Sequence, residues 1–362
     1  MSQMTMRERQ LAVVEGREHD QVPFCQYVGV GPSMEDAWEV VGKDCFGAMP
    51  GASIHAIETP NCRYEWEESQ REGQPYYYAR LITPEGTLTA EYRLQRDLGV
   101  MVAAKHYVVE PEDYRPLLAY LRDQHFRPNP ESYLQADASV GENGLPHTWG
   151  IRTVWQALWV EWVDATDLAY HVADEPKLME EVFATLEANQ TKYFKVAAEA
   201  CKQAPVPYIS LGDNITASMI GESYFRRFCL PAYEEFKGLL ADAGVATQVF
   251  VHMDGDLAPL WSAIAESAVT GLDSFSPQPD NDTSVAQARE QWPEMTLLVN
   301  FPSSVHLAPP ADVYRIAMEL MQQNGRQGRL QIQISENPPR TRWRDSYAAI
   351  AQAVRDFGRA CC

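Results

Sequence analysis

Residues 246–277, ATQVFVHMDGDLAPLWSAIAESAVTGLDSFSP, decide the fold. A short run rich in β-branched and aromatic residues ends at a polar HMDGD segment. A helical pattern follows over 257–271, and a second apolar run begins at Leu272. Strand-like runs that alternate with helical patterns predict parallel strands, because parallel strands need a crossover connection. The stretch therefore predicts one strand–helix–strand unit of an α/β protein.

The same alternation repeats through the C-terminal half of the chain. The other strand-like runs are PYISLGDN (207–214), TLLVNFP (296–302) and RLQIQISENPP (329–339). The helical patterns that follow the five strands cover 222–244, 257–271, 283–292, 310–325 and 344–360. Five strand-then-helix units favour a (β/α)8 TIM barrel over a short open sheet. No GxGxxG or GxxxxGK[ST] motif follows a strand, which argues against a dinucleotide or P-loop site.

The N-terminal half predicts an additional β-rich patch. Residues 63–110 contain several strand-like runs, and TPEG at 83–86 has the composition of a hairpin turn. Helical patterns follow at 112–123 and 174–203. We interpret the patch as an insertion or side layer of one domain that spans 1–362, not as an independent domain.

Composition and charge limit the classes of function. The chain has 362 residues and a formal net charge of -20, which opposes binding to nucleic acid and to anionic membrane surfaces. No apolar run approaches the roughly 20 residues that span a bilayer. The first ten residues, MSQMTMRERQ, lack an apolar signal core. We expect a soluble, cytoplasmic protein.

The cysteines give no sign of a structural framework. The chain has 7 of them, an odd number, at irregular spacings and without a CxxC pair. This pattern argues against a set of disulfides and against a zinc knuckle. The terminal pair, Cys361 and Cys362, has the composition of a metal or redox element, but chain ends seldom carry a site.

His252 and Asp254 are the first candidates for a functional site. Strand alternation places Gln248, Phe250, His252 and Asp254 on one face, so the histidine and the aspartate are expected to point into the same space. In a barrel, that space is the C-terminal mouth, where active sites lie. The alternative is a structural core histidine. Asp254 favours function, because a buried carboxylate is costly without a partner or a metal.

Two further polar groups follow predicted strands. Glu336 continues the strand face of Leu330, Ile332 and Ile334, and the alternative is that it caps a turn or pairs with a nearby arginine. Asp213 and Asn214 follow the YISL run. They are expected to contact a ligand or, alternatively, to hold a loop.

Aromatic residues and histidines supply the candidates for substrate contact. Trp155, Trp159 and Trp162 share one helical face, which is more typical of a core than of a pocket. The candidates that we place in loops or near the mouth are Trp149, His147 and His106. The SSVH segment at 303–306 has no GxSxG nucleophile elbow, so a serine hydrolase is not favoured.

Four segments together resemble the uroporphyrinogen decarboxylase superfamily. They are MTMRERQLAVVEGREHDQVPF (4–24), ITPEGTLTAEYR (82–93), EPEDYRPLLAYL (110–121) and ESYFRRFCLPAYEEFKGLL (222–240). That superfamily includes the decarboxylase itself and zinc methyltransferases that serve methylated corrinoid proteins. The resemblance implies a single (β/α)8 barrel with a deep C-terminal cleft, often in a homodimer.

The resemblance also implies a metal site, with substitutions. Zinc methyltransferases of this kind bind the ion through a His-x-Cys pair and a later cysteine. Here the corresponding residues are His252, Asp254 and Glu336. One nitrogen and two oxygen ligands are compatible with zinc but also admit iron, manganese or nickel. The decarboxylase's substrate-binding arginines have no counterpart in the segment 24–33, FCQYVGVGPS.

The sequence therefore predicts a metal-dependent enzyme of methyl transfer or demethylation, acting on a small methylated compound with a corrinoid protein as partner. Asp254 and Asp213 are its predicted catalytic carboxylates, and Asn214 is expected to contact the substrate. One alternative is a metal-free decarboxylase or lyase in which Asp213 or Asp254 stabilises a protonated intermediate. A second alternative is a barrel that binds a ligand without catalysis.

Overall fold

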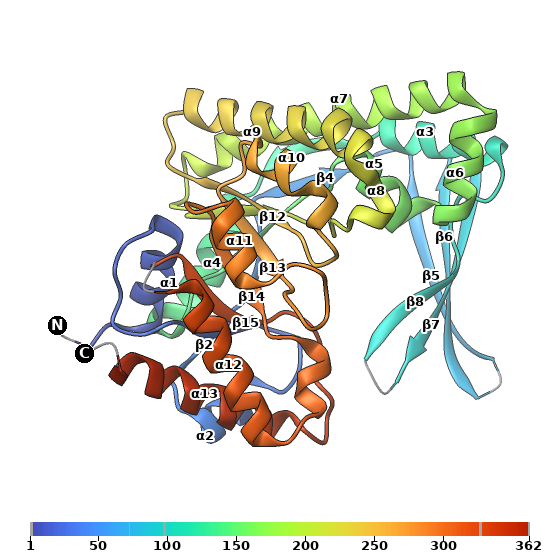
Figure 1. The fold of residues 1–362 in the computed structure, drawn as a ribbon. Coiled ribbons are helices and arrows are strands. Elements are labelled where there is room, and N and C mark those ends of the chain that lie inside the picture. Colours follow the sequence, from blue (N-terminus) through green and yellow to red (C-terminus); the bar gives the residue numbers. More distant parts are fainter. Residues whose placement is uncertain (1–2, 72, 97–98, 326–327, 361–362) are drawn as a thin grey trace.

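Nine parallel strands form a barrel in the computed structural model, which describes residues 3–71, 73–96, 99–325 and 328–360 (Figure 1). Their order in the sheet is β2 (Phe46–Met49), β1 (Phe24–Tyr27), β15 (Leu330–Ile334), β14 (Thr296–Asn300), β13 (Gly271–Phe275), β12 (Gln248–His252), β11 (Tyr208–Leu211), β10 (His147–Gly150) and β3 (Gly51–Ser53). The two outermost strands, β2 and β3, are separated in the chain by Pro50 alone. The sheet therefore closes on itself, and the predicted TIM barrel is confirmed.

All five predicted strand-then-helix units are present. The helices that follow the strands are α8 (Ala217–Tyr224) with α9 (Leu230–Asp242), α10 (Trp261–Ala265), α11 (Val285–Gln291), α12 (Pro310–Asn324) and α13 (Trp343–Ala360). A π-helical turn, Phe225–Cys229, joins α8 to α9. The helix expected over 257–271 is much shorter, because the Ser267 hydroxyl donates to the carbonyl oxygen of Ile264 at 2.7 Å and ends it.

Helix α1 (Met6–Glu15) closes the N-terminal end of the barrel. It begins at Thr5, whose side chain forms a capping box with Glu8, and ends at Gly16 in the left-handed conformation. Its apolar side chains join an inner cluster with residues of the barrel strands; the members include Met6, Val13, Val14, Cys25, Tyr208, Phe250 and Leu298. The interior is therefore filled with apolar side chains at this end.

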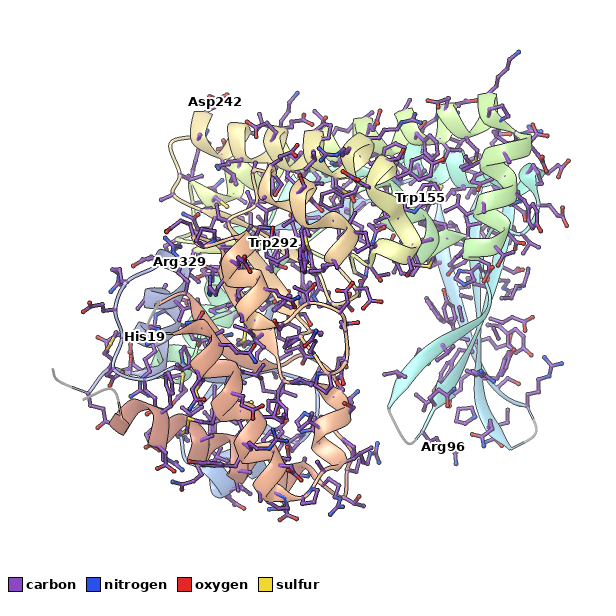
Figure 2. All side chains as sticks on the ribbon, in the orientation of Figure 1. His19, Arg96, Trp155, Asp242, Trp292 and Arg329 are labelled. Carbon is purple, nitrogen blue, oxygen red and sulfur yellow. The ribbon has the colours of Figure 1, made fainter. Side chains whose placement is uncertain are left out.

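The remaining helices are α2 (Met34–Val41), α3 (Tyr114–Arg122), α4 (Pro130–Val140), α5 (Val154–Ala157), the π-helical turn Leu158–Trp162, α6 (Ala165–Asp174) and α7 (Pro176–Cys201), with 3-10 turns at Pro111–Asp113, Gly141–Asn143, Ala258–Leu260 and Ser303–Leu307. Most of these helices lie around the barrel, whereas α3 and α6 lie at one end of a four-stranded antiparallel sheet between residues 63 and 105 (Figure 1). Trp155, labelled in Figure 2, stacks on Tyr224 with 4.3 Å between ring centroids. Trp155 and Trp162 are buried, so their predicted place in a core is confirmed.

The predicted β-rich patch is a four-stranded antiparallel sheet of β5 (Arg63–Arg71), β6 (Gln74–Thr83), β7 (Gly86–Gln95) and β8 (Val100–Lys105). Thr83 pairs with Gly86 across the expected hairpin turn. The sheet projects from the barrel in Figure 1, and β6 and β7 pack at their base against α3. A separate two-stranded sheet joins β4 (His55–Glu58) to β9 (His125–Pro128).

No helix in the described ranges is long and apolar enough to cross a membrane. Cys361 and Cys362 lie outside the described residues. The five cysteines of the described part are buried and free: Cys25, Cys45, Cys62, Cys201 and Cys229.

Candidate active site

A buried carboxylate, Asp273 on β13, lies in the C-terminal half of the barrel interior. It accepts hydrogen bonds from the Tyr27 hydroxyl at 2.7 Å, the Ser210 hydroxyl at 2.9 Å and the Gln333 amide at 3.1 Å. These donors come from three other strands. Burial would raise the pKa of Asp273, but the nearby imidazoles of His147 and His252 and the donated hydrogen bonds hold it well below its usual value. Asp273 is therefore a fixed negative charge inside the barrel.

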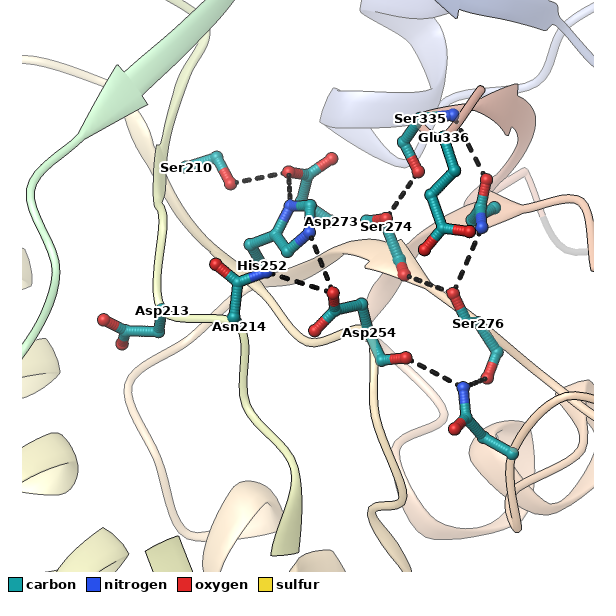
Figure 3. Close-up of polar contacts among 12 residues, drawn as sticks. Ser210, Asp213, Asn214, His252, Asp254, Asp273, Ser274, Ser276, Ser335 and Glu336 are labelled. Carbon is teal, nitrogen blue, oxygen red and sulfur yellow. Dashed lines mark hydrogen bonds and ion pairs between the residues drawn. The ribbon is translucent and has the colours of Figure 1, made fainter. Parts of the chain in front are cut away.

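His252, the last residue of β12, lies between two carboxylates (Figure 3). Its Nδ1 is 3.1 Å from Asp273 Oδ2, and its Nε2 is 3.6 Å from Asp254 Oδ2. Burial would lower the pKa of His252, but the hydrogen bonds and charges of the two aspartates raise it to about 10. The imidazole is therefore protonated on both nitrogens at neutral pH.

Asp254 connects this imidazolium to the rim of the barrel. The Asn214 amide nitrogen donates to Asp254 Oδ2 at 3.0 Å, and its oxygen accepts from Arg152 Nη2 at 3.1 Å. Asn214 has a φ of 51°, a conformation that is uncommon outside glycine and that orients its side chain. A continuous line of polar contacts thus runs from Asp273 through His252, Asp254 and Asn214 to Arg152.

His147 and Trp149 lie on β10, not in a loop as predicted. His147 is fully buried, with Nδ1 3.1 Å from the Tyr208 hydroxyl and Nε2 3.5 Å from Asp273 Oδ2. Burial lowers its pKa to about 4, so this imidazole is neutral. The Trp149 ring packs 4.1 Å from His147 and 5.9 Å from His252, centroid to centroid. We refer to Asp273, His252, Asp254 and Asn214 as the His252 cluster, or simply the cluster. Trp149 borders this cluster, whereas His147 lies behind it, next to Asp273.

An irregularity in β13 accompanies the cluster. The register between β13 and β14 shifts between Leu272 and Phe275, and Ser274 has a φ of 55°. The Ser274 hydroxyl lies 2.5 Å from the hydroxyl of Ser335, the residue that follows β15. Bulges of this kind redirect neighbouring side chains and occur beside active sites. Here the irregularity lies directly after Asp273.

The comparison with protein families places these residues in a known group. A family model described as Uroporphyrinogen decarboxylase (URO-D) matches residues 164–331, which include Asn214, His252, Asp254 and Asp273. The match supports a divergent relationship of these residues to the uroporphyrinogen decarboxylase superfamily. It agrees with the resemblance noted in the sequence.

The chain is also similar to solved structures. A methyltransferase from Methanosarcina mazei has a TM-score of 0.56 and 14% identity, and the match covers 98% of this chain and 99% of that one. D-psicose 3-epimerase with D-tagatose, from Clostridium cellulolyticum H10, has a TM-score of 0.37 and 14% identity, with 64% and 84% covered. No curated protein matches the chain at a significant level. The likeness to the methyltransferase establishes the fold over the whole chain.

Two of the three metal ligands that the superfamily resemblance implied, His252 and Asp254, lie together, and no hydrogen bond or ion pair among the described residues joins Glu336 to them. Glu336 is exposed at the end of β15 and accepts a hydrogen bond from the Ser303 hydroxyl. In the described part of the chain, no group of three or more His, Cys, Asp and Glu residues is arranged to hold a metal ion. Both nitrogens of His252 face carboxylates, an arrangement that fits a protonated imidazole. Metal binding by His252, Asp254 and Glu336 stays a prediction.

Two other predicted site residues lie apart from the cluster. Asp213 is fully buried and points away from His252 in Figure 3; it accepts from the Thr153 backbone N–H and the Tyr233 hydroxyl, both at 2.6 Å. Burial raises the pKa of Asp213 above its ordinary value despite these bonds. His106 follows β8 and is half-buried. No contact among the described residues joins it to the cluster.

The sequence interpretation missed the residue at the centre. Asp273 stands in the run LDSF, where a carboxylate interrupts an otherwise apolar buried strand. Such a group requires partners inside the protein, and that requirement was the available signal. Its partners Tyr27, Ser210 and Gln333 come from strands far apart in the chain, so their convergence is visible only in the closed barrel.

Proposed function

We propose that the chain is an enzyme that removes a methyl group from a small methylated compound, with His252 as the proton donor to the heteroatom that loses the methyl group. The observation that supports it is the position of His252 between Asp273 and Asp254 at the C-terminal end of the barrel strands. Active sites of TIM-barrel enzymes lie at this end.

The chemistry needs a proton donor of suitable strength. When the bond between the heteroatom and the methyl carbon breaks, the heteroatom leaves as an anion unless it receives a proton. An imidazolium with a pKa of about 10 matches leaving groups such as phenols, whose pKa values are also about 10. His252 Nε2 lies 3.6 Å from Asp254 Oδ2, too long for a strong hydrogen bond, so its proton is available to a substrate.

The methyl group needs an acceptor from outside the chain. In this proposal it is a reduced corrinoid on a partner protein, as the superfamily resemblance suggests, and the corrinoid supplies the nucleophile when it is bound. The chain's own residues orient and protonate the substrate: Asp273 fixes the imidazole through Nδ1, and Asn214 holds Asp254 beside Nε2. His252 thus takes over the polarising role that the sequence assigned to zinc or another divalent metal.

A turnover assay tests the proposal. The purified protein is incubated with reduced cobalamin and a panel of O-, S- and N-methyl compounds, and demethylated product and methylcobalamin are both measured. The expected result is equal formation of the two products, reduced at least 100-fold in His252→Gln. The matched control is His125→Gln, an exposed histidine on β9. Full activity of His252→Gln would overturn the proposal.

A second candidate is decarboxylation of a small carboxylated substrate. The name of the matching family model favours it, and the same imidazolium is able to protonate the carbon that loses CO2. A tetrapyrrole with many carboxylates is not favoured, because Arg152 beside the cluster is already paired with Glu161 at 3.0 Å. Release of CO2 without methyl transfer would identify this function. Ligand binding without either product would leave the barrel as a binding protein.

A further inference from the structure

A cavity of about 340 Å³ borders Trp149, whose ring also packs against His147 and His252. It is lined by residues of β10, α3, α7 and the π-helical turn at Leu158–Trp162, and by Tyr64 of the four-stranded sheet. Its walls carry five aromatic side chains: Tyr64, Tyr120, Phe126, Trp149 and Trp162. Several of these rings already contact one another; Tyr64 and Tyr120 meet edge to face at 5.6 Å, and Tyr120 and Trp162 lie 5.4 Å apart.

The polar groups of the cavity leave no uncompensated charge. Arg152 is paired with Glu161, and the Asn189 amide is occupied by hydrogen bonds to the carbonyl oxygen of Leu121 and to Gln124. The pKa of His55 is lowered by burial to about 4, so its ring is neutral. The charges of Arg152 and Glu161 offset each other, so the lining offers no net charge to a carboxylate or an ammonium group.

Two buried side-chain atoms of the lining lack a hydrogen-bond partner in the described part of the chain, the donor Arg152 Nε and the acceptor Oε1 of Gln190 on α7. Gln190 is 5% exposed. A buried acceptor without a partner is costly, and a hydrogen-bond donor on a ligand would remove that cost. Gln190 therefore specifies the polar end of the missing ligand.

We propose that this cavity binds one uncharged aromatic ring that carries a hydrogen-bond donor, as a phenol does, with the ring against Tyr64, Tyr120 and Trp162 and the donor directed to Gln190. A cavity of roughly 150 Å³ accommodates benzene, so the present volume holds a ring with substituents. Aromatic walls favour a flat ring over an aliphatic one of equal size, since ring pairs gain edge-to-face and offset contacts.

The inference deepens the proposed function, and in that respect it rests on it. Trp149 is a wall of both the cavity and the His252 cluster, and Arg152 lines the cavity while its Nη2 donates to Asn214, the neighbour of Asp254. A ring in the cavity is thus adjacent to the line of contacts that ends at the proton donor. The substrate class is then a methylated hydroxyaromatic compound, and the heteroatom stays on the ring.

Calorimetric titration of the full chain with phenol, toluene, cyclohexanol and benzoate tests the binding step without any methyl acceptor. Phenol is expected to bind at least tenfold more tightly than cyclohexanol and benzoate. Gln190→Met keeps the approximate shape of the side chain. It is expected to lower the affinity for phenol at least tenfold and to leave the affinity for toluene unchanged. Equal phenol affinity in Gln190→Met and the parent protein, or no binding of any aromatic probe, would overturn the inference.

A second pair of variants tests the same inference if Gln190→Met does not fold. Tyr64→Leu removes an exposed part of the cavity wall and is expected to weaken both phenol and toluene. Tyr78→Leu, on the opposite face of the same sheet, is the control and is expected to bind both like the parent. Equal effects of the two variants would count against the cavity.

The outcomes separate this inference from the proposed function. Selective phenol binding without demethylation of any compound would support ligand binding in the cavity and overturn the proposed function. Demethylation of aliphatic compounds by a protein that does not bind phenol would support the proposed function and overturn ligand binding in the cavity.

Discussion

Asp273 and His252 are neighbours in the parallel register of β13 and β12, and 3.1 Å separates Asp273 Oδ2 from His252 Nδ1. The pair is thus fixed by two barrel strands, not by a flexible loop. The opposite nitrogen of His252 faces the mouth through Asp254. An imidazole held by one carboxylate at Nδ1, with its Nε2 towards the end of the barrel where active sites lie, is the arrangement expected of a proton donor.

Replacing Asp273 with asparagine is expected to lower the pKa of His252 from about 10 towards its ordinary value of 6.5, because one of its two stabilising charges is lost. At pH 8 the imidazole would then be mostly neutral, and turnover would fall at least tenfold. Nuclear magnetic resonance titration of the imidazole measures the shift. Asp213→Asn serves as the control, and an unchanged His252 pKa in Asp273→Asn would refute the assignment.

The stability of the protein is expected to decrease as pH rises towards 10. The folded-state pKa of His252 is raised above its unfolded value, so its contribution is fully present below about pH 6.5 and is lost as pH rises through about 10. Urea unfolding of the parent and of His252→Gln between pH 6 and 10 measures it. The difference in free energy of unfolding between the two should shrink with rising pH; a constant difference would be inconsistent with a charged His252.

Asp213→Ala is expected to destabilise the fold by about 1–3 kcal/mol, because the buried Tyr233 hydroxyl and the Thr153 N–H lose their acceptor. Tyr233→Phe, which removes one donor, should cost less. Urea unfolding gives both values. If Asp213→Ala kept its stability and lost all turnover, the catalytic role first predicted for Asp213 would regain support.

Asn214→Gly and Asn214→Ala separate the two roles of this residue. Glycine accepts the observed φ of 51° without strain, so Asn214→Gly should stay folded while losing the contacts to Asp254 and Arg152. Asn214→Ala is expected to be less stable by about 1 kcal/mol, since it adds left-handed strain. Both should reduce turnover to a similar extent. Parent-like kinetics in Asn214→Gly would show that the line of contacts is dispensable.

Metal content is expected to be well below one ion per chain after incubation with zinc, iron, manganese or nickel salts and dialysis. The reason is that Glu336 bonds to Ser303 and that no group of three or more His, Cys, Asp and Glu residues in the described ranges is arranged to hold a metal ion. Plasma emission spectrometry measures the content. Stoichiometric metal in the parent that disappears in His252→Ala and Glu336→Gln would restore the metal-dependent hypothesis.

The barrel was predictable because periodicity is a local property of sequence. Each strand run and helical pattern between 207 and 360 was visible on its own, and closure followed from their number. Ser267 shows one limit of such prediction, because the helix ends before it although the sequence pattern continues. Asp273 shows a second limit. Its donors lie on strands up to 246 positions away, so its role depends on the register of the closed sheet.

Glu336 illustrates the converse error. Strand alternation placed it correctly at the barrel's C-terminal end, but alternation does not fix where a side chain beyond the last strand residue points. Ile334 is the last residue of β15, and Glu336 follows in a loop where the Ser303 hydroxyl is its partner. His252, in contrast, is still inside its strand, and its orientation was predicted.

Helix α1, which closes the N-terminal end of the barrel, has a consequence for the rate of turnover. Met6 and Val13 pack among the inner side chains of the strands, and Thr296, at the start of β14, donates to the carbonyl oxygen of Val13. The barrel is therefore filled at this end, and we expect substrate and product to use the opposite, C-terminal end. Where product must leave by the way substrate enters, product release is expected to limit turnover together with bond breaking.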